Sequence, residues 1–243
     1  FALAKNANDI AVKKIVRKIY IHWFLNIVDF LKHPFVRGDN FKKRIELTGI
    51  ENIDSSLKKG KGIVIFTAHL GNFEWGACRV AVEGYPIWGT GLTRKSRRTM
   101  LFFENRRLSK GLKTLYVNKV MTGIFRILKN NEIIAIPTDF DPLGTARLYK
   151  FFGKEAYVPS GPVEIALKSG AVLIPSFIWR KDKYSHRQII GEPVELLPIK
   201  AVDDRDKKME IIDENMQKMI SIMEKYIIEH IEQWELFHDI WQK

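Results

Sequence analysis

The sequence predicts a single α/β domain with a largely parallel or mixed central sheet flanked by helices. Three observations support this class. The 243 residues are 46% hydrophobic, which suffices to bury one sizeable core. Short apolar runs alternate with segments of helical periodicity, the order typical of α/β proteins. No repeat, low-complexity tract or compositional break divides the chain, so we expect residues 1–243 to form one domain.

The chain opens with a basic amphipathic helix, which we expect over residues 8–31. Ile15, Ile19, Trp23 and Ile27 recur at helical spacing. Several lysines and arginines lie on either side of Ile15. Such a helix, rich in aromatic residues, suits a membrane interface. The same pattern fits a helix that packs on the core with a solvated basic face, and both interpretations stay open.

The later elements alternate as an α/β fold requires. Apolar runs predict strands, which we expect at residues 62–66, 86–92, 132–138 and 171–179, with an edge strand near 188–195. Helical patterns predict helices, which we expect at residues 73–82, 97–107, 120–129, 162–169 and 206–231. Asn130-Asn131 and Gly170 should end the third and fourth of these helices. The methionine stripe of the last helix should fill core space rather than bind a ligand.

Charge and cysteine content limit the class of function. The formal net charge is +12, which predicts an acidic partner: nucleic acid, an anionic membrane surface, or phosphorylated substrates and carriers. The single cysteine, Cys78, excludes an intramolecular disulfide framework and a cysteine-rich zinc site, and it suits a reduced, cytosol-facing compartment. No uncharged apolar run reaches the roughly 18–20 residues that a membrane span needs, and no signal peptide is visible.

The strongest candidate for chemistry is the segment Thr67-Ala68-His69-Leu70-Gly71-Asn72-Phe73-Glu74, directly after the strand at 62–66. Open α/β sheets place their ligands where a strand ends. A histidine base needs a partner that fixes its tautomer, and a carboxylate is the usual one. Across a turn centred on Gly71 the side chains of His69 and Glu74 could meet. We therefore expect His69 to act as a general base towards a hydroxyl, although a capping histidine and a solvated glutamate would look the same.

Two further strands end in polar clusters. One leads into Thr93-Arg94-Lys95-Ser96-Arg97-Arg98, and the other into Thr138-Asp139-Phe140-Asp141-Pro142. If the strands are parallel neighbours, both clusters and His69 meet at one rim of the sheet. We expect the basic cluster, with Arg106 and Arg107, to bind phosphate. A solvated basic face ranks slightly lower, and nucleic-acid binding ranks third.

Asp139 and Asp141 allow three interpretations. They could bind a divalent metal, as in nucleotide-sugar transferases. They could form a phosphatase nucleophile pair, although Leu143 stands where that pattern has threonine. They could cap the following turn, hold Arg147 and organise the site, which is the interpretation we favour. The sequence contains no Gly-rich phosphate loop, no His-Glu-x-x-His and no Gly-x-Ser-x-Gly motif, which disfavours serine and zinc hydrolysis.

In order and spacing, these segments resemble the bacterial lipid A biosynthesis acyltransferases, the lauroyl and myristoyl transferase family, with phosphatidylinositol-mannoside acyltransferases as close relatives. The run from His69 to Glu74 resembles the family's His-x4-Glu motif, and Arg94 resembles its arginine after the next strand. Later blocks that resemble the family lie at residues 128–132, 139–141, 151–175 and 233–241. The resemblance covers the chain from about Ile45. Phe73, Phe140 and Pro142 depart from the family's usual residues, which bears on substrate preference.

The resemblance implies a glycerolipid-acyltransferase-like fold and transfer of a fatty acyl chain to a hydroxyl of a glycolipid such as a lipid A precursor. The donor would be a thioester of acyl carrier protein or CoA, with no further cofactor and no metal. His69 would be the base, Glu74 would orient it, and Arg94 or backbone N–H groups after Gly71 would stabilise the oxyanion. Further oxyanion or substrate contacts would come from Asn72, Arg97, Arg106, Arg107, Asp139, Asp141 and Arg147.

The resemblance also implies a place at the cytoplasmic face of the bacterial inner membrane. We expect the enzyme to bind there peripherally through its basic helix, or through an N-terminal anchor that this chain lacks. Nucleic acid is not an expected partner. Two alternatives remain: a metal-dependent glycosyltransferase that uses Asp139 and Asp141, and a non-enzymatic basic lipid-binding module.

Overall fold

A mixed, mostly parallel sheet organises the computed structural model, which describes residues 9–116, 120–199 and 204–241. In this part of the chain the sheet has seven strands in the order β1-β9-β8-β2-β5-β3-β4. The strands are β1 (Ile45–Thr48), β2 (Ile63–Thr67), β3 (Ile87–Gly91), β4 (Lys113–Tyr116), β5 (Ile133–Pro137), β8 (Val172–Arg180) and β9 (His186–Ile190). The five strands from β8 to β4 are parallel, whereas β9 runs antiparallel to β8 and pairs with β1 in parallel. The predicted α/β class is confirmed.

Helices alternate with these strands along the chain. They are α1 (Asp9–Lys32), α2 (Gly38–Lys43), α3 (Glu51–Leu57), α4 (Phe73–Val82), α5 (Arg97–Leu108), α6 (Val120–Lys129), α7 (Gly161–Ser169) and α8 (Arg205–Glu229), with a short 3₁₀ helix at Ile231–Gln233. The helix expected over residues 8–31 is α1, although residue 8 lies outside the described residues. Among the described helices, none combines the length and the apolar composition that a membrane crossing needs.

The central strands are buried on both faces. Ile63 and Ile65 of β2 pack with residues of α3 and α4, whereas Val64 and Phe66 pack with α6, α7 and α8. This division follows from the strand geometry, in which successive side chains point to opposite faces. It also explains why the sequence of β2 is a continuous apolar run rather than an alternating one.

Two groups of elements differ from the prediction. The sequence analysis did not predict β1, α2, α3, β4 or a hairpin formed by β6 (Arg147–Phe151) and β7 (Lys154–Val158). The strand expected near 188–195 is β9, which ends at Ile190 and is not an edge strand, because β1 pairs with its outer side. β1 has only four residues and buries only Ile45 fully, so it left no hydrophobic pattern to detect.

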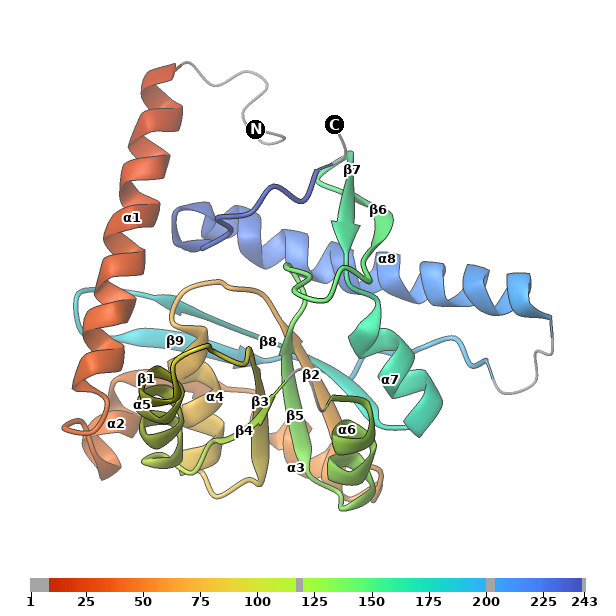
Figure 1. Ribbon diagram of the computed structural model, residues 1–243, viewed down its shortest axis with the longest axis horizontal. Helices are drawn as coiled ribbons and strands as arrows, with labels where there is room; N and C mark the ends of the chain where they lie inside the picture. Colours follow the sequence, from red (N-terminus) through yellow and green to blue (C-terminus); the bar gives the residue numbers. More distant parts are fainter. Residues whose placement is uncertain (1–8, 117–119, 200–203, 242–243) are drawn as a thin grey trace.

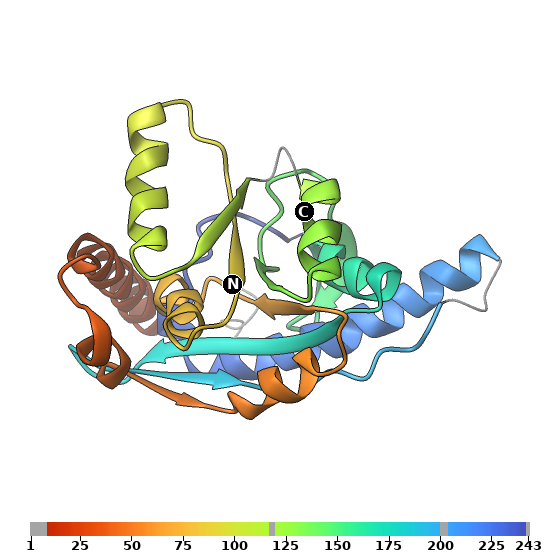
Figure 2. The same cartoon turned by 90° about the horizontal axis from the view of Figure 1, so that it is seen from below.

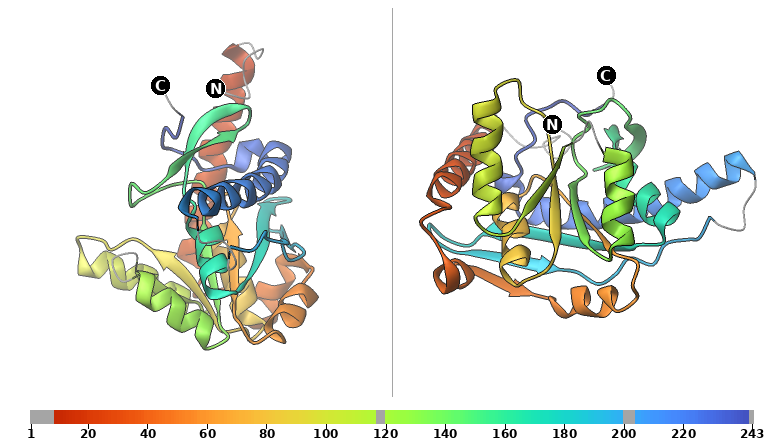
Figure 3. Two further views of the ribbon diagram at one scale, coloured as in Figure 1. Left: turned by 90° about the vertical axis from the view of Figure 1, so that its right-hand side faces the viewer. Right: turned by 60° about the horizontal axis from the view of Figure 1, so that its bottom comes forward.

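The sheet is strongly twisted: in Figure 2 the cyan strands β8 and β9 run across the page, whereas the yellow to yellow-green strands β3 and β4 run steeply up it. Long helix α8 crosses one side of the sheet below the β6–β7 hairpin (Figure 3). Its methionines 216, 219 and 223 are fully buried, as expected for core filler. The hairpin and the N-terminal half of α1 both project beyond the same end of the sheet (Figure 1).

Candidate active site

His69 and Asp139 face each other just beyond the ends of β2 and β5. Thr67 and Pro137, the last residues of these neighbouring parallel strands, are partners in the sheet register. Two residues further on, Nδ1 of His69 lies 2.7 Å from Oδ1 of Asp139, and the backbone N–H of His69 donates to Oδ2 over 2.8 Å. A carboxylate at Nδ1 keeps the proton on that nitrogen, which leaves Nε2 as the basic atom. Within the described residues Nε2 has no hydrogen-bond partner.

Asp139 is fully buried and is surrounded by donors. Besides the two bonds from His69, Oδ2 accepts the indole N–H of Trp234 over 2.8 Å. Burial raises the pKa of Asp139, but the charge of His69 and these hydrogen bonds bring the pKa below its ordinary value. Burial likewise lowers the pKa of His69, and the nearby Asp139 carboxylate more than offsets this, so the net shift is upward. The pair therefore suits a base whose protonated form is stabilised.

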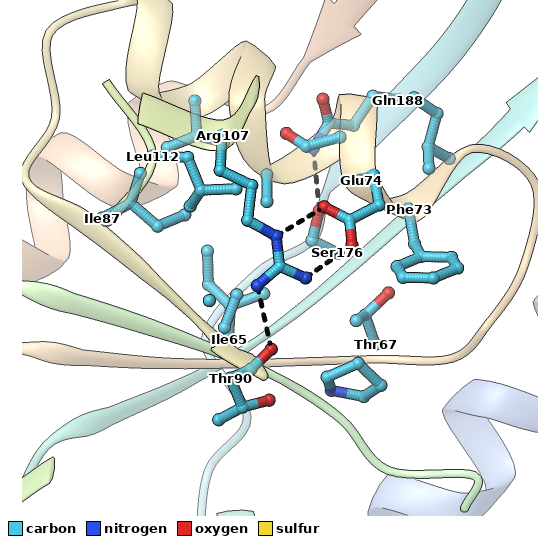
Figure 4. A pocket seen from close by; sticks show the side chains of 17 residues that line it. Ile65, Thr67, Phe73, Glu74, Ile87, Thr90, Arg107, Leu112, Ser176 and Gln188 are labelled. Atoms are coloured by element: carbon cyan, nitrogen blue, oxygen red, sulfur yellow. Dashed lines mark hydrogen bonds and ion pairs between the residues drawn. The ribbon is translucent and has the colours of Figure 1, made fainter. Parts of the chain in front are cut away.

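Glu74 does not take the expected place beside His69. Its carboxylate makes a two-pronged ion pair with Arg107, with distances of 2.9 Å from Nε to Oε2 and 2.5 Å from Nη2 to Oε1 (Figure 4). Arg107 also donates to the carbonyl of Thr90 and to the hydroxyl of Thr114. The expected His69–Glu74 pairing is wrong, because Glu74 lies in the first turn of α4 and pairs with α5 instead.

A mostly apolar cleft lies beside this ion pair (Figure 4). Thr67 and Pro137 line it at the strand ends, and Ile65 and Ala135 line it two residues earlier. The cleft therefore extends back along β2 and β5 towards the core. Other lining residues include Ala77, Val80, Ile87, Gly89, Leu112 and Ile178. Phe73, which also lines the cleft, contacts the His69 ring with a centroid distance of 4.8 Å. A lining of this kind fits a hydrocarbon chain next to the histidine.

A second cleft shares Glu74 and Arg107 with the first. Arg94 lines it, and the Arg94 guanidinium stands 4.1 Å from the centroid of the Phe103 ring. Because β2, β5 and β3 are neighbours, the prediction that their three polar clusters share one rim is confirmed. The basic cluster after β3 thus borders the same region as the His69–Asp139 pair.

The other predicted basic residues differ in exposure. Arg97 begins α5 and is exposed to solvent. Arg106 stacks on Phe102 of the same helix at 3.4 Å from the ring centroid. Arg97 is therefore free to meet an anionic ligand, whereas the Arg106 side chain is held against its own helix.

Asn72 caps α4 rather than facing a substrate. Its Oδ1 accepts the backbone N–H of Trp75 over 3.1 Å, and its Nδ2 donates to Asp29 over 3.3 Å. Only 2% of the residue is exposed. The expected substrate contact of Asn72 does not fit this placement, and a helix cap is the usual role of asparagine at such a position.

The Asp139 and Asp141 carboxylates are occupied as hydrogen-bond acceptors. Asp141 accepts two backbone N–H groups of the turn that follows it, as predicted. The expected contact with Arg147 is wrong, because Arg147 pairs with Asp213 of α8 over 2.9 Å. In residues 9–116, 120–199 and 204–241, no group of three or more His, Cys, Asp or Glu side chains could hold a metal ion.

The C-terminal segment, which the sequence analysis noted only for its resemblance to the family, supplies two residues to which no role was assigned. Trp234 donates to Asp139, and the backbone N–H of Glu235 donates to the His69 carbonyl over 2.8 Å. Burial raises the pKa of Glu235 to about 7, although the Asn26 hydrogen bond and the charge of His69 lower it. The indole N–H of a buried tryptophan usually has an acceptor, and that preference was the signal that could have assigned Trp234 a role.

Comparison with known proteins adds to this geometry. The family described as bacterial lipid A biosynthesis acyltransferase matches residues 8–243. A phosphatidylinositol mannoside acyltransferase of Mycobacterium tuberculosis (strain CDC 1551 / Oshkosh) is 26% identical over 136 residues, which cover 54% of this chain and 43% of the relative. The protein of the same name from Mycolicibacterium smegmatis is 23% identical over 150 residues, which cover 60% and 49%. The matched regions thus span about half the length of these relatives.

Proposed function

Because the chain belongs to the bacterial lipid A biosynthesis acyltransferase family, we propose that it moves a fatty acyl chain from a thioester to a hydroxyl of a glycolipid, such as a lipid A precursor. Acyl carrier protein or CoA would carry the thioester. The observation that carries this proposal is the His69–Asp139 pair, whose histidine contacts the wall of an apolar cleft through Phe73. Acyl transfer to a hydroxyl requires a base next to an apolar cleft that can receive the acyl chain.

The proposed reaction proceeds without a covalent enzyme intermediate. Nε2 of His69 takes the proton of the acceptor hydroxyl while its oxygen attacks the thioester carbonyl. The tetrahedral intermediate then expels the thiolate, which takes the proton back from His69. The buried Asp139 carboxylate, 2.7 Å from Nδ1, stabilises the imidazolium formed in between. Asp139 therefore has the orienting role that we had expected of Glu74.

The oxyanion needs donors close to His69. The first turn of α4 begins at Phe73, and the free N–H groups of a helix N-terminus favour negative charge. The N–H of Gly71 is not available, because it donates to the carbonyl of Gln233 over 2.9 Å. We assign this role to N–H groups that follow Gly71 and to Arg94, which lines the adjoining cleft. Loss of one such donor typically lowers the rate by about 10²–10³.

The two clefts suggest where the donor binds. In the proposal its acyl chain fills the apolar cleft, and its carrier lies over the basic cluster that follows β3. Arg97 is exposed there, so it suits the phosphates of CoA or the acidic surface of a carrier protein. Glu74 and Arg107, which line both clefts, would hold α4 and α5 together at this junction.

The exposed face of α1 supports membrane attachment rather than packing on the core. Tyr20, Phe24, Ile27 and Leu31 are spaced by four, three and four residues, so they form one stripe of the helix. They are 55%, 60%, 37% and 47% exposed. Lysines and arginines at positions 13, 14, 17 and 18 lie near the start of the helix. We therefore propose that α1 lies on the anionic cytoplasmic leaflet of the inner membrane, where the glycolipid acceptor is found.

Transfer of label from a long-chain acyl thioester to a bacterial lipid extract tests the proposed function. The parent protein, His69→Gln and the control His230→Gln are compared, with acyl-CoA and acyl carrier protein as separate donors. We expect the parent and His230→Gln to label lipid, and His69→Gln to lose transfer while it remains folded at the assay temperature. Transfer by folded His69→Gln at the parent rate would contradict the mechanism. A folded parent that transfers from neither donor would contradict the function.

A further inference from the structure

Asn26 of α1 joins three separate parts of the site. Its Nδ2 donates to the carbonyl of Gly71 over 2.8 Å and to Oε1 of Glu235 over 2.5 Å. Its Oδ1 accepts from Nη2 of Arg180, at the end of β8, over 2.8 Å. The amide thus uses both its donor side and its acceptor side, and these partners fix its orientation.

Asp29 adds a second link one helical turn later. Its carboxylate accepts from Nδ2 of Asn72, the residue that caps α4, and pairs with the same Arg180. Asp29 and Arg180 are only 8% and 6% exposed. A buried ion pair of this kind holds its geometry, because separating the charges leaves each of them without a partner.

The residues that α1 contacts belong to the segment that carries His69. Gly71 and Asn72 follow the histidine directly, and the backbone N–H of Glu235 donates to the His69 carbonyl. Gly71 has φ +55°, and a Cβ there would lie 2.3 Å from the carbonyl oxygen of Ile178. The His69 segment is therefore packed against β8 on one side and hydrogen-bonded to α1 and the C-terminal segment on others.

The two faces of α1 thus have different neighbours. The stripe that contains Tyr20 and Phe24 is exposed, while Asn26 and Asp29 face the site. We infer that Asn26 and Asp29 are positioning residues that hold the His69 segment in its reactive geometry, so that turnover depends on how the membrane-binding helix is seated. This inference rests on the proposed role of His69 as the base. Helix α1 would then have two roles: it binds the membrane, and it holds the His69 segment in place.

The variant Asn26→Leu tests this inference, because it removes all three hydrogen bonds with little change in volume. We expect kcat to fall by about 10- to 100-fold, the range that a displacement of about 1 Å costs. The KM for the thioester should stay within about twofold, because Asn26 lines neither donor cleft. Binding to vesicles with anionic lipid should equal that of the parent, whereas Phe24→Ser should weaken it.

The matched control is Asn52→Leu in α3, where the side chain also donates to a backbone carbonyl, that of Ile190, over 3.1 Å. It should leave kcat unchanged. The low-field resonance of the His69 Nδ1 proton gives an independent readout, and it should move in Asn26→Leu but not in the control. If Asn26→Leu does not fold, Asn26→Ser serves in its place.

A folded Asn26 variant with parental kcat and an unmoved Nδ1 resonance would overturn the inference. A loss of kcat that only follows a loss of vesicle binding would overturn it too, since α1 would then act as an anchor alone. Both results presuppose an active parent whose transfer requires His69. An inactive parent would instead refute the proposed function, so the two failures are distinguishable.

Discussion

Replacement of Asp139 by asparagine should almost abolish turnover while leaving the fold intact. Among the described residues, Oδ2 of Asp139 accepts from both the His69 backbone and Trp234, and Oδ1 accepts only from Nδ1 of His69. The single amide oxygen of asparagine therefore goes to the Oδ2 position. The amide NH₂ then faces Nδ1, which must become an acceptor, and the ring proton moves to Nε2. His69 would be held in the tautomer that cannot take a proton from the acceptor.

The expected loss is about 10³- to 10⁴-fold in kcat, comparable to the loss of the orienting carboxylate in Ser-His-Asp enzymes. At about 1.4 kcal/mol per tenfold, this corresponds to roughly 4–6 kcal/mol of transition-state stabilisation. The free energy of unfolding should fall much less, by at most about 3 kcal/mol, because only the charge-assisted bond to Nδ1 is lost.

Thiol release from the acyl donor in the presence of lipid acceptor measures kcat, and urea denaturation measures stability. Asp54→Asn is the control, since this exposed carboxylate of α3 bonds only to the Tyr85 hydroxyl in the described residues. An Asp139→Asn protein that is folded and turns over at the parent rate would refute our assignment. A loss of activity that is matched by unfolding would show that Asp139 acts through stability.

Glu74→Gln should lower the free energy of unfolding by about 1–3 kcal/mol, because it leaves the partly buried Arg107 guanidinium without its charge partner. An unchanged urea midpoint would contradict this. The pKa values of His33 and His186 are lowered by burial from 6.5 to about 4 and about 3. The unfolded chain therefore binds protons first as pH falls below 6.5, and each histidine should cost roughly 2–3 kcal/mol of stability between pH 7 and pH 4.5. Equal urea midpoints at the two pH values would exclude this. Gly89→Val should shift donor preference towards shorter acyl chains, because Gly89 lines the apolar cleft and the nearest atom to an added Cβ lies at 3.7 Å. Competition between short- and long-chain donors measures this, and an unaltered preference would place the acyl chain elsewhere.

Local patterns predicted the elements whose cause is local. The apolar run of β2 and the turn at Gly71 mark the start of α4, and Gly170 ends α7 in the left-handed conformation, with φ +75°. The partners within the site, by contrast, were not predicted by local patterns. His69 was assigned the nearest carboxylate in sequence, Glu74, whereas its true partner lies 70 residues away. That pairing depends on β5 being the neighbour of β2, a fact of strand order that no local pattern contains.

The contacts of Asn26 escaped the sequence analysis for a related reason. A single asparagine in a basic amphipathic helix has no periodic or motif signal, and its partners Arg180 and Glu235 are 154 and 209 residues away. The partly buried ion pair of Glu74 and Arg107 spans 33 residues, and no local pattern predicted it either. Composition and periodicity identified the rim of the sheet, but only the packing of its strands and of α1 identified which side chains meet there.

The register of β2 against β5 also bears on how such an enzyme can diverge. His69 and Asp139 are brought together by the backbone pairing of Thr67 with Pro137, not by the 70 residues of chain that separate them. Those residues contain α4, α5 and α6, the basic cluster and much of the wall of both clefts. Insertions, deletions and substitutions in α5 and the basic cluster can therefore accumulate without moving the histidine from its carboxylate. Such a lineage could exchange one donor or acceptor for another while its proton-transfer chemistry stays constant.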